Sequence, residues 1–106
     1  MTRAIVVGSD PNGIGEALAD RGVEVARATG TGDREALTDA GVEGADLLVV
    51  TDAGLATSIP VARELTPDIK VVAYTGNSLP EFALASAALI VDPDLMSPET
   101  VAEELA

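Results

Sequence analysis

Short apolar runs of strand length alternate along this chain with segments in which apolar residues recur at the spacing of a helix. Such alternation is typical of a parallel sheet whose strands are joined by crossover helices. A chain of 106 residues forms one domain with one core, and right-handed crossovers on so short a chain favour the strand order 2-1-3-4-5. We therefore predict one α/β domain over residues 1–106, Rossmann-like or flavodoxin-like: a three-layer α/β/α sandwich around a five-stranded parallel sheet.

The second expected strand differs in pattern from the others. It alternates along residues 23–27, so we expect it at an edge of the sheet with Glu24 and Arg27 toward solvent. The first, third and fourth are continuous apolar runs, as expected for strands covered by helices on both faces. The predicted strands are residues 4–7, 23–26, 46–51, 70–74 and 88–91.

Capping residues mark where helices begin. Ser78 and Glu81 have the spacing of a capping box, and Ser97 precedes Pro98, which suits the first position of a helix. Pro60 falls in the first turn of its helix, where proline is tolerated. The predicted helices are residues 15–21, 33–40, 57–65, a segment that starts at 78–81, and 97–105.

A glycine-rich turn, G-S-D-P-N-G-I-G from Gly8 to Gly15, joins the first strand to the first helix. Glycines let a backbone approach phosphate closely, and the N–H groups at a helix start attract anions. The spacing departs from the dinucleotide fingerprint G-x-G-x-x-G, and Asp10 would repel a phosphate. Two interpretations stay open: a modified phosphate-binding loop, or a structural turn in which Asp10 caps its own helix and occupies the anion site.

The predicted strand order places a ligand crevice outside the carboxyl ends of the first and third strands. The glycine-rich turn, residues 51–54 and residues 75–78 would project into it. Glycine and small polar residues also serve in turns and caps, so a purely structural reading remains. No catalytic residue is predicted, and the candidate nucleotide-binding residues are Gly8, Ser9, Asp10, Asn12, Gly13, Ile14, Gly15, Arg27, Thr51, Asp52, Thr75 and Asn77.

Three acids, Asp10, Asp52 and Asp92, lie at or just past the ends of expected strands. Carboxylates that converge on one rim are typical of Mg²⁺ sites. Alternatively, Asp52 and Asp92 bond backbone N–H groups in their own turns, and acids are simply frequent in this chain. The sequence does not decide between the two, and no metal ligand is assigned.

Composition excludes several classes of function. The chain has 18 acidic and 6 basic residues, a net charge of -12 and 2% aromatic residues, so nucleic acid is not expected as a partner. This acid excess resembles the proteins of extreme halophiles, in which concentrated salt screens the charges. The alternative is an acidic protein that docks a basic partner, although the acids are spread along the chain and do not form a block. Histidine and cysteine are absent, which removes the commonest general base and thiol catalysis. Without a membrane span or leader pattern, we expect a cytoplasmic domain with no membrane contact.

From Gly32 onward the sequence resembles the N-terminal nucleotide-binding domain of potassium-uptake regulators, the KTN or RCK family. The similarity runs through residues 40–51, 62–67, 71–73 and 87–93. It implies a sensor of NAD(H) or adenine nucleotides that forms a homodimer. The family's ribose-binding acid is missing before Asp33, so Arg27 is the candidate contact to a ribose phosphate, and a strand-helix unit is deleted between Arg27 and Gly32.

The second half also resembles the receiver domain of response regulators, on residues 46–52, 72–76 and 97–99. The position of the phosphate-accepting aspartate falls on Thr51, the acidic pair after the first strand is missing, and the lysine after the fifth strand is Asp92. The resemblance therefore implies a protein-docking module without phosphotransfer. A third likeness is to short halophile proteins that carry a CTP synthetase label, but the chain is too short for that enzyme and has no cysteine for glutamine hydrolysis.

These observations lead to three functional hypotheses. The first is a small non-enzymatic regulatory domain that binds NAD(H), another nucleotide or a similar phosphate ligand and reports it through a homodimer or a protein partner. The second is a receiver-like interaction module without ligand. The third is a minimal NAD(P)-dependent oxidoreductase. Hydride chemistry of that kind uses a tyrosine-lysine pair, and the sole tyrosine, Tyr74, and the sole lysine, Lys70, are not placed as one. We expect Tyr74 in the core.

Overall fold

The computed structural model describes residues 2–85, 87 and 89–106. Five parallel strands form one sheet in the order β2-β1-β3-β4-β5, as predicted. The strands are β1 (Arg3–Val7), β2 (Glu24–Ala28), β3 (Leu47–Val50), β4 (Lys70–Tyr74) and β5 (Leu89–Val91). The helices are α1 (Ile14–Asp20), α2 (Arg34–Asp39), α3 (Ser58–Leu65), α4 (Glu81–Leu84) and α5 (Pro98–Leu105), with short 3-10 turns η1 (Val42–Gly44) and η2 (Ala53–Leu55).

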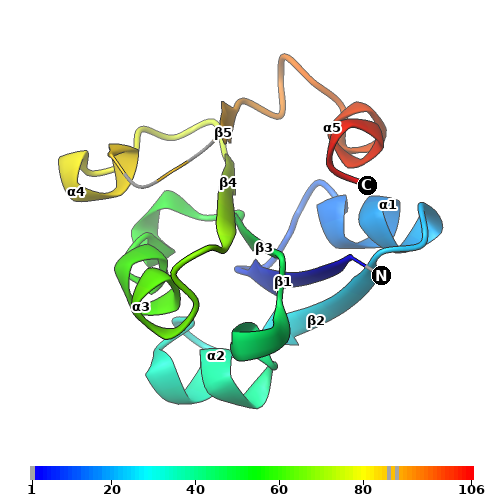
Figure 1. The fold of residues 1–106 in the computed structure, drawn as a ribbon. Coiled ribbons are helices and arrows are strands. Elements are labelled where there is room, and N and C mark those ends of the chain that lie inside the picture. Colours follow the sequence, from blue (N-terminus) through cyan, green and yellow to red (C-terminus); the bar gives the residue numbers. More distant parts are fainter. Residues whose placement is uncertain (1, 86, 88) are drawn as a thin grey trace.

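The helices cover the sheet from two sides (Figure 1). Alternate side chains of β1 point to opposite faces, so that Ile5 and Val7 pack toward α2, α3 and α4 while Ala4 and Val6 pack toward α1 and α5. In β1, β3 and β4 nearly every residue is buried, which explains why these strands read as unbroken apolar runs. The three predicted layers are confirmed, and β2 lies at an edge as expected.

Of the two helix starts predicted from capping residues, one is confirmed and one is wrong. Ser97 caps α5 as predicted: its hydroxyl accepts from the Thr100 N–H at 3.3 Å, and Pro98 is the first helical residue. The capping box predicted at Ser78 is wrong. Pro80 takes an extended conformation (φ -60°, ψ 153°), so α4 begins only at Glu81 and has no side-chain cap. The predicted start of the fifth strand at residue 88 lies outside the described residues.

Tyr74 is a core residue, as expected. Its ring is buried beneath α1 and α5, and its hydroxyl donates to the Met96 carbonyl at 2.7 Å. Burial raises the pKa of Tyr74 above the usual 10.0, and the carboxylates of Glu99 and Asp10 raise it further. The folded protein therefore holds this proton more tightly than the unfolded chain does.

This pKa shift predicts a loss of stability in alkali. Above pH 10.0 the unfolded chain releases the Tyr74 proton while the folded protein keeps it, so the free energy of unfolding should fall as pH rises through the folded pKa. Tyrosinate absorbance reports Tyr74 alone, because it is the only tyrosine and tryptophan is absent. In the folded protein this absorbance should appear at a higher pH than in the unfolded chain. Urea unfolding of Tyr74→Phe at the same pH values is the control. An ordinary pKa in the folded protein would contradict the prediction.

Candidate functional site

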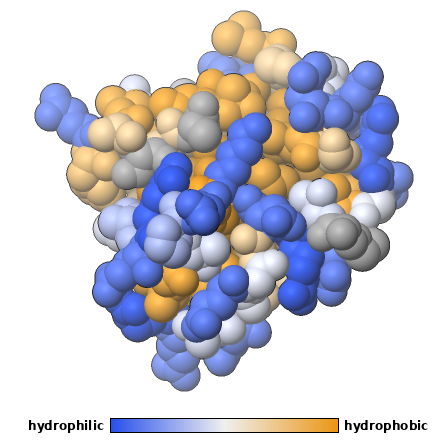
Figure 2. Space-filling model, viewed as in Figure 1, coloured by the Kyte–Doolittle hydropathy of each residue, from blue (hydrophilic) through white to orange (hydrophobic). Residues whose placement is uncertain are grey.

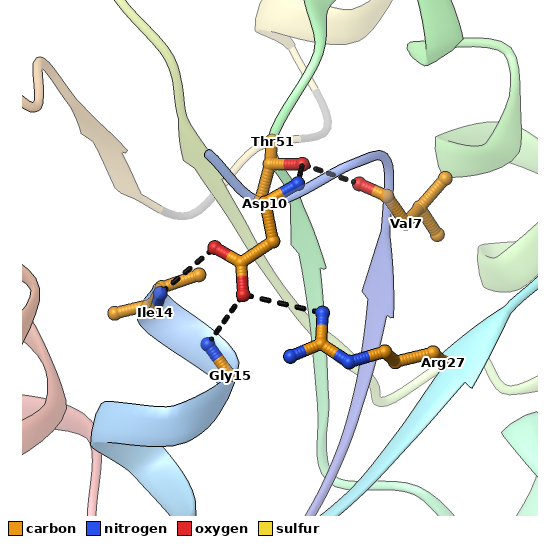
Figure 3. Close-up of polar contacts among 6 residues, drawn as sticks. All are labelled: Val7, Asp10, Ile14, Gly15, Arg27 and Thr51. Atoms are coloured by element: carbon orange, nitrogen blue, oxygen red, sulfur yellow. Dashed lines mark hydrogen bonds and ion pairs between the residues drawn. The ribbon is translucent and has the colours of Figure 1, made fainter. Parts of the chain in front are cut away.

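The loop that follows β1 is held by the end of β3. Val7 and Val50 are partners in neighbouring strands, so Gly8 and Thr51 emerge at the same rim of the sheet. The Thr51 hydroxyl donates to the Val7 carbonyl at 3.0 Å and accepts from the Asp10 N–H at 3.2 Å (Figure 3). Thr51 is buried, so these bonds are shielded from water. Its side chain is thereby committed to fixing the loop.

Asp10 occupies the start of α1. Its carboxylate accepts from the backbone N–H groups of Ile14 at 2.8 Å and Gly15 at 2.9 Å, and the Arg27 guanidinium lies 3.2 Å away (Figure 3). The Asp10 side chain is 2% exposed, whereas that of Arg27 is 48% exposed. A helix start carries partial positive charge, and bonds between N–H groups and a carboxylate are strong. The anion at this loop is the protein's own carboxylate.

Two glycines allow this arrangement. A Cβ at Gly8, where φ is 111°, would collide with the Thr51 hydroxyl. A Cβ at Gly15 would lie 2.5 Å from Arg27 Nη2 and 3.1 Å from Asp10 Oδ2. Asp10 itself has a positive φ of 54°, a conformation that aspartate tolerates better than most residues. The contact with Thr51 therefore requires glycine at position 8, and Gly15 leaves room for the Arg27 guanidinium beside Asp10.

The structure brings together about half of the residues predicted for a nucleotide site. Ser9 and Asn12 are exposed, and the Gly13 N–H donates to the Asp10 carbonyl at 3.2 Å. Thr75 and Asn77 belong to another loop, where the Asn77 N–H donates to the Thr75 hydroxyl at 3.3 Å. The predicted residues that meet are Gly8, Asp10, Ile14, Gly15, Arg27 and Thr51.

The three candidate metal-binding acids have separate local partners. Asp52 accepts from the Gly54 N–H at 2.8 Å, and Asp92 accepts from the Asp94 N–H at 2.8 Å, each in its own turn, while Asp10 caps α1. Among the described residues, no group of three or more His, Cys, Asp or Glu side chains is arranged to hold a metal ion. The local-turn interpretation accounts for Asp52 and Asp92, and the helix-cap interpretation accounts for Asp10.

Three hollows on the surface lie away from the loop. One of about 430 Å³ follows β2 and is lined by residues that include Asp33, Glu35 and Asp39, whose charges disfavour a phosphate. Two more flank β5, with volumes of about 370 and 410 Å³. Residues 8–15 line none of these three hollows. In the described ranges, no helix combines the length and the apolar character that crossing a membrane requires.

An apolar surface surrounds β5, which we name the apolar rim, and it was not predicted from the sequence. Its side chains are each more than a third exposed, and hydrophobic atoms gather over α4 and β5 in Figure 2. The signal in the sequence is the run of three apolar residues, Phe82 to Leu84, since a single short helical turn cannot direct all of them toward the sheet. In the structure Ala83 is buried, whereas Phe82 and Leu84 are exposed. The apolar rim consists of Phe82 (51% exposed), Leu84 (46%), Leu89 (37%), Ile90 (49%) and Leu95 (82%).

Comparisons with known proteins place this geometry among receiver-like folds. The model of a family of unknown function, DUF7126, matches residues 4–105, and no curated protein matches the sequence. HP1043, an orphan response regulator of H. pylori, is 20% identical with a TM-score of 0.72, covering 98% of this chain and 92% of that one. A CheY-like receiver domain protein of Methanospirillum hungatei JF-1 is 21% identical with a TM-score of 0.72, covering 99% and 90%. The response regulator TrrA, solved in complex with the histidine kinase ThkA, is 23% identical with a TM-score of 0.67, covering 99% and 96%.

These findings overturn the resemblance to the KTN or RCK family. The TrkA-N domain of the inner membrane protein ybaL from Escherichia coli is 21% identical but has a TM-score of only 0.56, with 99% of this chain and 97% of that one covered. Residues 29–33 lead from β2 directly into α2, so the sheet is complete without a deleted unit. The description of the chain as a KTN-like nucleotide-binding domain is wrong. Which cofactor, NAD(H) or another nucleotide, a site here would take stays a prediction.

Proposed function

The chain belongs to the family of unknown function DUF7126, and from its site we propose that it is a non-enzymatic, receiver-like protein-interaction module that uses neither nucleotide nor phosphotransfer. One observation carries the proposal: the Asp10 carboxylate already occupies the N–H groups of Ile14 and Gly15 and the exposed guanidinium of Arg27. A phosphate ligand would have to displace this carboxylate from three partners. The loop is therefore better suited to holding the fold than to binding a nucleotide.

The residues at the receiver's reactive positions support the same proposal. Thr51 stands where the resemblance expects the phosphate-accepting aspartate, and its hydroxyl bonds Val7 and Asp10 within the protein. Asp92 stands where a lysine is expected, and its carboxylate bonds the Asp94 N–H. A hydroxyl and a carboxylate in these places supply neither the acceptor nor the positive charge that the resemblance requires. Phosphotransfer by the receiver route has no residues to use.

The fold itself supports protein docking as the proposed activity. TrrA, which shares this fold, was solved in complex with a histidine kinase. A stable α/β scaffold presents helices, loops and a sheet edge to a partner whether or not its loop binds phosphate. We therefore expect this chain to act by binding protein.

The oxidoreductase alternative gains no support from the site. Lys70 and Tyr74 are the first and last residues of β4, so their Cα atoms are about 13 Å apart along the strand. The Tyr74 hydroxyl is buried and donates to the Met96 carbonyl. They do not form a tyrosine-lysine pair for hydride chemistry.

Ligand binding and partner binding can be measured on one purified preparation in about 1 M KCl. Thermal shift with NAD(H), NADP(H), ATP, AMP, CTP and cyclic dinucleotides should show no stabilisation, whereas a ligand at 100 times its dissociation constant would add about 2.7 kcal/mol. Incubation with acetyl phosphate and Mg²⁺ should leave the intact mass unchanged, with an active receiver domain as positive control. Capture from cells in the same salt should yield a stoichiometric protein without bound nucleotide. Saturable nucleotide binding or a phosphorylated product would overturn the proposal.

A further inference from the structure

We propose that the apolar rim of β5 is a docking surface for a second copy of this chain. This inference rests on the proposed function, because it names the surface and the partner through which an interaction module of this kind would work. It draws on three independent features of the described residues: where the exposed hydrophobic side chains lie, how β5 ends the sheet, and where the sole lysine is placed.

The first feature is the concentration of exposed apolar side chains. All the large hydrophobic residues that are exposed in the described part of the chain lie in α4, in β5 or in the turn after β5. Leu95 is the most exposed, at 82%. Monomeric proteins rarely leave large apolar side chains gathered on one face, and such a face typically marks a contact with another protein.

The second feature is the open edge of the sheet. β5 pairs with β4 on one side only, and its outer edge ends the sheet. Hollows flank it on both faces: one of about 370 Å³ is lined in part by Leu89, Met96 and Leu105, and one of about 410 Å³ is lined in part by Ile90 and Leu95. A protruding side chain such as Leu95 is complementary in shape to the more apolar of the two hollows, which Leu89, Met96 and Leu105 line in part. Two copies related by a twofold axis would present both to each other.

The third feature is charge, which selects a second copy over a basic protein. Arg3, Arg21, Arg27 and Arg34 each pair with an acid of their own chain. Lys70 forms no ion pair with any described residue, and it lines the same hollow as the exposed Glu104. Across a twofold axis, Lys70 of one copy can pair with Glu104 of the partner subunit, and the reverse pair forms with it.

Electrostatic repulsion between copies acts at the rim as well as over the rest of the surface, because Glu81 beside Phe82 and Asp94 beside Leu95 are exposed. Each chain carries a net charge of -12, so two copies repel each other over most orientations in dilute salt. A basic partner would be repelled by Lys70 in this hollow. A second copy would offer a carboxylate to Lys70 and an ammonium group to Glu104. Concentrated salt screens the repulsion, and the apolar contact remains. Self-association through the rim should therefore strengthen as salt is added, which is the opposite of binding to a basic partner.

The test is sedimentation of the full chain in about 0.1 M and about 1 M KCl. We expect a dimer that is favoured in the higher salt. Leu95→Asp should raise its dissociation constant tenfold or more, by about 1.4 kcal/mol for each factor of ten. Thr38→Asp adds the same charge at an exposed position of α2, away from the rim, and should leave the dimer intact. Circular dichroism checks that both variants fold, as expected since Leu95 is 82% exposed.

A charge exchange tests the twofold arrangement. Lys70→Glu and Glu104→Lys should each weaken the dimer, and the double variant should restore it, because both interchain pairs are re-formed with the signs reversed. A monomer in both salts, equal effects of Leu95→Asp and Thr38→Asp, or occupation of the rim by a different protein would overturn this inference. A monomer that still captures another protein would leave the proposed function standing. Nucleotide binding would overturn the proposed function whether or not copies associate.

Discussion

Gly8→Ala is expected to lower the free energy of unfolding by about 4 kcal/mol, one of the two largest effects that we predict for a single substitution in this chain. At φ 111° an added Cβ is strained, and it would collide with the Thr51 hydroxyl. That hydroxyl links the Val7 carbonyl to the Asp10 N–H, so moving it disturbs both hydrogen bonds. The loss therefore combines backbone strain, overpacking and weakened buried hydrogen bonds.

Gly22→Ala provides a matched control. Gly22 also has a positive φ, 84°, but an added Cβ there would meet no atom within 4 Å. Its cost should be the backbone strain alone, about 1 kcal/mol. Urea unfolding of the two variants beside the parent chain, in the same salt, measures the difference. Equal losses would show that the contact with Thr51 contributes nothing.

Asp10→Ala is expected to destabilise the chain by about 3 kcal/mol. The substitution removes the acceptor for the buried N–H groups of Ile14 and Gly15 and leaves Arg27 without its anion. The ion-pair contribution is small, since the Arg27 side chain is 48% exposed and water screens it. Most of the loss comes from the cap of α1. Asp10→Asn keeps one acceptor oxygen and a residue that tolerates positive φ, so its cost should be about half as large.

Asp52→Ala is the comparison for Asp10→Ala. Asp52 also accepts a backbone N–H with its carboxylate, from Gly54 at 2.8 Å, but its side chain is exposed. Water can replace it, and we expect a loss of about 0.5 kcal/mol. Chemical denaturation gives both values, and hydrogen exchange at Ile14 and Gly15 locates the effect. If Asp10→Ala cost no more than Asp52→Ala, the buried cap would have no special role.

Most of the fold could be predicted because its cause is local. Unbroken apolar runs in β1, β3 and β4 reflect helices on both faces, and the alternation along β2 reflects an edge. The start of α4 could not be located from its capping signal, because the conformation of Pro80 outweighed the serine before it. The strand order could be predicted because the chain is short and because crossover connections between parallel strands are right-handed in nearly all proteins.

The site was harder to predict because its contacts join distant segments. Arg27 was expected to face solvent, and its side chain is half exposed, but the bond of its guanidinium to Asp10 depends on where β2 and the loop after β1 end. The same sequence pattern, glycines around an acid, suits a phosphate loop and a self-capped helix equally well. The family resemblance failed for a related reason, since apolar runs and polar turns recur in every doubly wound sheet.

The carboxylate of Asp10 is tethered to the loop that it fills, and this has a kinetic meaning. A tethered group acts at an effective concentration of about millimolar or above, and it never diffuses away. Asp10 is bonded to Ile14, Gly15 and Arg27, so the loop holds an occupant that is part of the chain itself. Under the proposed function, the shape of the loop is independent of the phosphates in the cell. Under the proposed function, signalling by such a domain is governed by how much of it is made and by which proteins it meets.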